Sequence, residues 1–222
     1  MKRNMVLRKK GKAQEYRKEK RMNKKIITMF VLFLTLIVTN AMAGPFGLYK
    51  GMSLKEIGGK PEKLKNGIYK VNVPKPHSAF EVYIVEVAPK GGLCWIKAVG
   101  NDIATSSYGI DLKSAFSKME EKLGATYGKH ETMDFLMTGS IWNEPNDWMM
   151  GLVKKERILA AIWGKSAELA AGEGSPLPSD IEQIALIALP ISRDKGYIEI
   201  EYSFTNKEAC EAELAAGEDD AL

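Results

Sequence analysis

The sequence predicts an α+β fold in which helices pack on one face of an antiparallel sheet. Two pairs of apolar, β-branched segments are each joined by a short turn containing glycine, the pattern of an antiparallel hairpin. They lie at residues 80–87 with 93–99, and at residues 184–189 with 197–204. Between them, apolar residues recur every three or four positions after Asp111, as in an amphipathic helix that covers a sheet.

The first 43 residues are expected to be an export signal with a basic extension. Residues 22–43 contain two lysines, an unbroken apolar run at 26–38, and the small residues Ala41 and Ala43, the order typical of a secretory signal peptide. The run is shorter than the roughly 20 residues that a membrane-spanning helix needs. We therefore expect a protein that is periplasmic or secreted after cleavage between Ala43 and Gly44, with no membrane span left.

Residues 1–21 are crowded with lysine and arginine. A nucleic-acid-binding arm is one interpretation. The alternative, which we favour, is a long signal region or an upstream extension with translation starting at Met22, because an arm before the signal would be removed on export. Residues 44–222 hold 20 lysines and arginines against 26 acidic residues, a net charge near −6. This charge argues against nucleic acid or an anionic membrane surface as partner.

Residues 44–108 are expected to form a first α+β half. A short helix should begin at Ser53, because its hydroxyl and the carboxylate of Glu56 can form a capping box, and it should end at the glycines and proline that follow. A strand at residues 68–73 and the first hairpin, with its turn at 89–92, complete this half.

Residues 109–222 are expected to form a second α+β half with an acidic C-terminal tail. Asp111 is the predicted N-cap of its first helix. Residues 143–157 are predicted to form a second helix and 158–163 a buried strand, whereas 132–142 have no clear pattern. The helix after Asp111 should bury an apolar stripe made of Leu112, Ala115, Phe116, Met119 and Leu123.

The last strand alternates, so one of its faces should be core and the other wet. Ile198, Ile200, Tyr202 and Phe204 share the apolar face, and Glu199, Glu201 and Ser203 the other. Cys210 follows on a short helical segment. Because Cys94 and Cys210 both lie in the exported part, an oxidising compartment predicts a disulfide between them, with two buried free thiols as the alternative.

A five-residue motif, G-x-[S/D]-L-K, occurs at residues 51–55 and again at 109–113, each time opening a predicted helix that strands follow. It predicts an internal repeat, and hence two tandem related modules, with coincidence of two short motifs as the alternative. The first copy, with the Gly-Lys-Pro at 59–61, resembles a pattern of small exported helix-plus-sheet modules. These include the small lipoprotein of the outer-membrane barrel-assembly machinery and the tandem-repeat β-lactamase inhibitor protein. The resemblance implies an α+β fold and a binding or scaffolding role.

Catalytic and metal-binding motifs are missing from the sequence. His77 and His130 are not at metal-ligand spacings, and there is no nucleophile elbow or phosphate-binding loop, so we expect no metal and no cofactor. One cluster of residue types suits a sugar: Trp142, Glu144, Asn146, Asp147 and Trp148. The rings would stack on the sugar, the acids would bind its hydroxyls, and paired carboxylates also suit glycoside hydrolysis. The alternative is a helix start, with capping amides, acids at the positive end of the helix dipole and both indoles packed inward.

Two functional hypotheses follow. The first is an exported, non-catalytic binding module for an unknown envelope protein or glycan, which would use one face of the sheet or the long loop at residues 164–180. The second is a carbohydrate- or peptidoglycan-active enzyme that uses Glu144 and Asp147. Paired carboxylates in a cleft would favour the enzyme, whereas carboxylates splayed at a helix end would favour the binding module.

Overall fold

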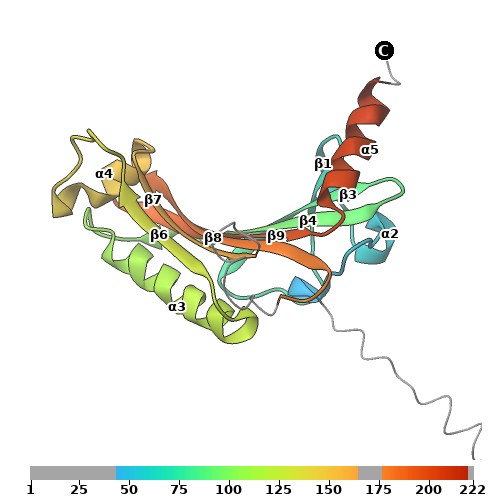
Figure 1. Ribbon diagram of the computed structural model, residues 1–222, viewed down its shortest axis with the longest axis horizontal. Coiled ribbons are helices and arrows are strands. Elements are labelled where there is room, and N and C mark those ends of the chain that lie inside the picture. Colours follow the sequence, from blue (N-terminus) through green and yellow to red (C-terminus); the bar gives the residue numbers. More distant parts are fainter. Residues whose placement is uncertain (1–43, 165–176, 220–222) are drawn as a thin grey trace, which may run out of the picture. The chain divides into compact units, whose positions relative to one another are not determined.

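The computed structural model describes residues 44–164 and 177–219, and it confirms the α+β class. Its nine strands form one antiparallel sheet in the order β1-β2-β3-β4-β9-β8-β7-β6, with the short β5 paired to β9 (Figure 1). The expected export signal and its cleavage point after Ala43 lie outside the described residues, as do residues 165–176 of the long loop.

The first half contains two helical segments and five strands: η1 (Pro45–Gly47), α2 (Leu54–Ile57), β1 (Glu62–Lys65), β2 (Ile68–Val71), β3 (Phe80–Ala88), β4 (Gly92–Gly100) and β5 (Ile103–Ala104). The capping box before α2 is confirmed. The Ser53 N–H donates to Glu56 Oε2 at 2.8 Å, and the Glu56 N–H donates to Ser53 Oγ at 3.3 Å. The hairpin of β3 and β4 is also confirmed.

In its described residues the second half contains four strands, three α-helices and one 3₁₀ helix: α3 (Ile110–Tyr127), β6 (Glu131–Leu136), η2 (Pro145–Asp147), α4 (Trp148–Val153), β7 (Arg157–Gly164), β8 (Ile181–Ser192), β9 (Lys195–Phe204) and α5 (Lys207–Asp219). The hairpin of β8 and β9 is confirmed. Two boundaries were predicted wrongly. The N-cap of α3 is Gly109, in a left-handed conformation with φ 69°, and not Asp111. The helix predicted at residues 143–157 covers only α4, which ends at Val153 and is followed by Lys155 at φ 58°.

The main core lies between α3 and the sheet. The predicted stripe of α3 is buried at Leu112, Phe116, Met119 and Leu123, and these side chains pack with the buried residues of β8 and β9. On β9 the predicted apolar face is buried as expected: Ile198, Ile200, Tyr202 and Phe204 are each at most 4% exposed. We call this side of the sheet the covered face.

The two halves meet where β4 pairs antiparallel with β9, from Trp95 opposite Ser203 to Val99 opposite Glu199. In each half a helix precedes the strands of the sheet, and β4 of the first half pairs with β9, the last strand of the second half. Residues 44–108 and 109–219 therefore share one sheet and belong to one compact unit. The duplication itself stays a prediction.

Helix α5 packs on the side of the sheet opposite α3, as Figure 1 shows. Cys210 on α5 and Cys94 on β4 have their sulfur atoms at disulfide distance, 2.07 Å, and their Cα atoms 6.3 Å apart. The helix has polar ties as well, because the carboxylate of Glu213 accepts the N–H groups of Lys90 at 2.7 Å and Gly91 at 2.9 Å. The C-terminal helix is thus held by these polar contacts as well as by the cysteine pair.

Candidate functional site

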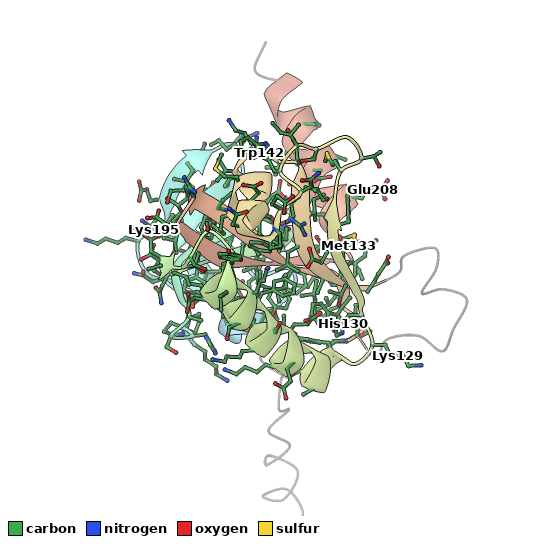
Figure 2. All side chains as sticks on the ribbon, turned by 90° about the vertical axis from the view of Figure 1, so that its left-hand side faces the viewer. Lys129, His130, Met133, Trp142, Lys195 and Glu208 are labelled. Carbon is green, nitrogen blue, oxygen red and sulfur yellow. A yellow bond between two sulfur atoms is a disulfide. The ribbon has the colours of Figure 1, made fainter. Side chains whose placement is uncertain are left out.

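The residues predicted to bind sugar do not gather on one open surface. Glu144 precedes η2 and is exposed, Asp147 ends η2 and is half-buried, and the Asp147 N–H donates to the Glu144 carbonyl at 2.9 Å. Asn146 is exposed and Trp142 is half-buried. Trp142 follows β6, at the opposite end of that strand from His130 (Figure 2). A ligand at Glu144 and Asp147 stays a prediction.

Trp148 belongs to the core. Its side chain is 4% exposed and packs with the buried residues of the covered face. The ammonium of Lys113 lies 4.2 Å from the centre of the indole, and burial lowers the pKa of Lys113. A Cβ on Gly109 would lie 2.1 Å from the Trp148 ring, so this indole also explains why glycine stands at the start of α3. The ring is therefore closed to a stacking ligand.

Both histidines have structural partners. His130 Nε2 lies 3.0 Å from Glu120 Oε1, and its ring stacks on Trp163 with centroids 4.4 Å apart. His77 Nδ1 accepts the N–H of Ala79 at 3.1 Å. Within residues 44–164 and 177–219, no three His, Cys, Asp or Glu side chains are grouped so that they could hold a metal ion.

The sheet face opposite α3, which we call the open face, is the surface with the strongest case for binding. Alternation along each strand and the cross-strand register place the same side of five neighbouring strands on it. Among the described helices, α5 packs on this face, at its β3 and β4 end. The open face consists of Val82 and Ile84 on β3, Trp95, Lys97 and Val99 on β4, Tyr197, Glu199 and Glu201 on β9, Ala185 and Ile187 on β8, and Ala160 and Ile162 on β7.

The centre of the open face is a charged network at the junction of the halves. Lys97 Nζ lies 2.8 Å from Glu199 Oε1 and 2.8 Å from Glu201 Oε1. The indole N–H of Trp95 donates to Glu201 Oε2 at 3.2 Å. The Lys97 ammonium also lies 5.4 Å from the centre of the Trp95 ring, within cation–π range. One lysine thus orders two carboxylates and a tryptophan.

Burial shapes the electrostatics of this network. It raises the pKa of Glu199 above its ordinary value, although the hydrogen bond from Lys97 opposes the change. Burial would lower the pKa of Lys97, but its hydrogen bonds to Glu199 and Glu201 outweigh that effect and raise it. The pKa of Tyr197, two residues along β9, is also raised by burial and then by the negative charge of Glu199. The lysine is therefore held in its charged form.

The sequence alone does not reveal this network. Glu199 was predicted to be wet, yet it is only 5% exposed, so that prediction is wrong. Its carboxylate is covered because Lys97 reaches across from β4 and because Val99 lies opposite it. Acidic residues at alternate positions of β9 and a lone lysine in β4 were visible as a pattern, but only the pairing of β4 with β9 brings them together.

Comparison with known proteins gives no relative: no protein-family model, curated protein or solved structure matches the chain. Among the described helices, none combines the length and the apolar character that crossing a membrane requires.

Proposed function

We propose that the protein is an exported, non-catalytic envelope protein that binds another protein through the open face. The observation that carries the proposal is the set of half-buried apolar side chains around Trp95 and Lys97 on a sheet face that α3 does not cover. Contiguous apolar surface on a folded protein marks an interaction site when polar groups accompany it. Tryptophan and tyrosine are the residues most enriched at the energetic centres of protein interfaces.

The chemistry of the open face suits a polypeptide partner. Apolar side chains such as Ile84 on β3 and Ile162 on β7 flank the charged network on its two sides. Apolar flanks supply buried area, and an ordered charge cluster selects the partner and its orientation. The negative charge of residues 44–222 disfavours nucleic acid.

Two observations support export as part of the proposal. Residues 22–43 have the order of a signal peptide. Cys94 and Cys210 lie at disulfide distance, and disulfides form and persist in oxidising compartments outside the cytoplasm. N-terminal sequencing of exported protein tests this part: Gly44 as first residue supports it, and retention of residues 22–43 contradicts it.

Site-specific photo-crosslinking tests the binding face. A photoreactive amino acid replaces Ile84 or Ile162 on the open face, or Ile110 on α3 as the control, which is an exposed isoleucine (62%) elsewhere on the molecule. In envelope-containing cells, both open-face positions should trap the same protein, and position 110 should not. Equal trapping at all three positions, or trapping at position 110 alone, would overturn the proposal.

The trapped protein then provides a quantitative test. Purified partner should bind the wild-type protein, and Ile84→Arg should weaken that binding at least tenfold, because it adds a third cation beside Lys97 and Lys70. Ile110→Arg, the matched control, should leave the affinity within about twofold. Unchanged affinity in Ile84→Arg would exclude the open face as the interface.

A further inference from the structure

An apolar pocket of about 470 Å³ lies where β7 and β8 diverge. In the described part of the chain, β7 pairs with β8 only over residues 160–164 and 183–187. Beyond that point the start of β7 pairs with β6, and the end of β8 pairs with β9. The two strands separate, and the C-terminal end of α4, at Leu152 and Val153, lines the space between them.

Local sequence explains the separation. Pro190 lies in the stretch of β8 that pairs with β9 but not with β7, and proline has no N–H to donate to a strand on the β7 side. On the other side, the turn after α4 is fixed by three backbone bonds, among them Lys155 N–H to Leu152 O and Glu156 N–H to Gly151 O, both 2.9 Å. The pocket is therefore part of the folded chain and needs no ligand to form it.

The lining combines apolar walls with two cations and no acid. Of the twelve lining residues, nine are aliphatic residues or proline, one is Tyr197, and the other two are Lys155 and Arg157. Val153 is 36% exposed and Ile191 50% exposed, so apolar surface is open to solvent here. A volume within the roughly 300–1,000 Å³ of small-molecule sites, with apolar walls and few polar groups, is typical of ligand pockets.

Arg157 lines the pocket and leaves one of its donors unpaired. Its guanidinium donates to Asp134 Oδ1 at 2.8 Å through Nη1, but its Nε is buried and has no hydrogen-bond partner among the described residues. Buried donors are rarely left without a partner. Arg157 is thus ion-paired with Asp134, whereas Lys155 has no ion pair among the described residues and keeps a left-handed backbone (φ 58°).

We propose that this pocket binds a single-chain anionic amphiphile, with the alkyl chain between β7 and β8 and the anionic head at Lys155 and Arg157. Apolar walls select the chain, and the two cations select a negative head over a neutral or positive one. A fatty-acid carboxylate and an alkyl phosphate share this chemistry. The pocket shares Ile187 and Tyr197 with the open face but contains no residue of the charged network, so ligand binding to it can be measured without the proposed protein partner.

Isothermal titration of the purified protein with alkyl carboxylates and alkyl phosphates, kept below micelle formation, tests the proposal. Dodecanoate should bind about 15-fold more tightly than decanoate, because each buried methylene contributes about fourfold. Dodecyl phosphate binding more tightly than dodecanoate would identify a phospholipid-like source, and the reverse order a free fatty acid. Equal or tighter binding of dodecyltrimethylammonium, which carries the opposite charge, would overturn the proposal, as would no binding of either anion.

Two variants locate the site without depending on weakened folding. Lys155→Gly removes the cation and at the same time relaxes the left-handed backbone, so it should unfold no more easily than wild type. It should nevertheless bind dodecanoate about three- to tenfold more weakly. Lys154→Ala, the neighbouring lysine outside the lining, should bind like wild type.

The apolar wall has its own matched pair. Ile191→Asp places a negative charge at the exposed rim of the pocket and should weaken dodecanoate binding at least tenfold. Ile141→Asp makes the same change at an isoleucine that is 74% exposed and outside the lining, and should leave the affinity within about twofold. Wild-type affinity in both Lys155→Gly and Ile191→Asp would overturn the placement of the ligand.

Discussion

Lys97 on β4 and Glu201 on β9 stand directly opposite each other across the junction of the two halves, with Lys97 Nζ 2.8 Å from Glu201 Oε1. The same ammonium is 2.8 Å from Glu199 Oε1, whose side chain is 6% exposed. One cation therefore compensates two carboxylates, one of them buried. This makes Lys97 a stabilising residue of the sheet as well as the centre of the open face.

Replacing Lys97 by methionine should lower the free energy of unfolding at neutral pH by about 1–3 kcal/mol. Methionine keeps the length and the apolar stem, but it leaves the Glu199 carboxylate buried without a cation. This expected loss of stability is smaller than the loss from breaking a fully buried ion pair, because the side chain of Lys97 is 25% exposed. Urea denaturation of the variant measures the loss.

Two further variants separate charge from packing at Lys97. Adding Glu199→Gln to Lys97→Met should restore most of the lost stability, because it removes the uncompensated charge. Lys195→Met breaks an ion pair with Asp102 whose side chains are 45% and 56% exposed, and it should cost less than about 1 kcal/mol. If the Lys97→Met and Lys195→Met variants were equally stable, the Lys97 network would contribute no more to stability than an exposed surface ion pair.

Gly109→Ala should destabilise the protein by about 2–4 kcal/mol. A side chain there adopts φ 69° and would bring its Cβ 2.1 Å from the Trp148 ring, so backbone strain and overpacking add. Gly139→Ala is the control, because Gly139 has φ 85° but nothing within 4 Å of its Cβ position. Thermal unfolding should show a clearly smaller loss for Gly139→Ala. Equal losses would mean that the indole moves aside at no cost.

Removing the link between Cys94 and Cys210 should lower the free energy of unfolding by about 2–4 kcal/mol. The loop it closes spans a sequence separation of 116, for which chain entropy gives an upper estimate near 5 kcal/mol. Hydrogen exchange in the Cys94→Ala/Cys210→Ala variant should rise first in α5, although the bonds of Glu213 to Lys90 and Gly91 keep it partly docked. A reductant should lower the melting temperature of wild type and leave that of the double variant unchanged. No response of wild type to the reductant would contradict the bridge.

The capping box before α2 should make stability depend on pH. Hydrogen bonds from the Ser53 backbone and then its hydroxyl lower the pKa of Glu56 below its ordinary 4.5. The folded state favours the ionised form of Glu56. The stabilisation that the capping box gives is therefore present at pH values above 4.5, and it is lost as the pH falls through the lowered pKa of Glu56. Wild type should therefore be more stable than Glu56→Gln near pH 7, and the two should converge in acid. In a Ser53→Ala background the difference should shrink; a difference that grows in acid would contradict the assignment.

The sequence predicted the elements whose signals are local. Turn-forming residues between apolar segments predicted the hairpins of β3 with β4 and of β8 with β9, and the spacing of Phe116 and its neighbours predicted α3. Elements without a local signal were missed. All four residues of β1 are exposed, so its composition carries no alternation, and its pairing with β2 alone makes it a strand. The helix predicted to run to residue 157 stops early because the chain must turn at Lys155 to enter β7.

The candidate sites were harder to predict, because they depend on contacts between distant segments. In the sequence, Trp148 and Asp147 look like equivalent members of a sugar-binding cluster. In the structure, the indole of Trp148 is buried in the core against Gly109. The pocket arises where β7 and β8 stop pairing, and no residue type except Pro190 marks that point. The charged network needs β4 beside β9, a pairing that local pattern does not specify.

The pairing of β4 with β9 also governs how the chain can fold. Residues joined at this junction, such as Lys97 and Glu201, are about 100 positions apart, so the middle of the sheet closes only after nearly the whole chain is present. Such long-range pairing slows folding, because the entropy of closing the loop is lost before the contacts form. Until then β4 is an unpaired edge, and an unpaired edge is a template for aggregation. In an exported polypeptide with this topology, the edge of β4 stays open to aggregation until β9 has been exported and has paired with it. The formation of β9 is therefore the step that ends this risk.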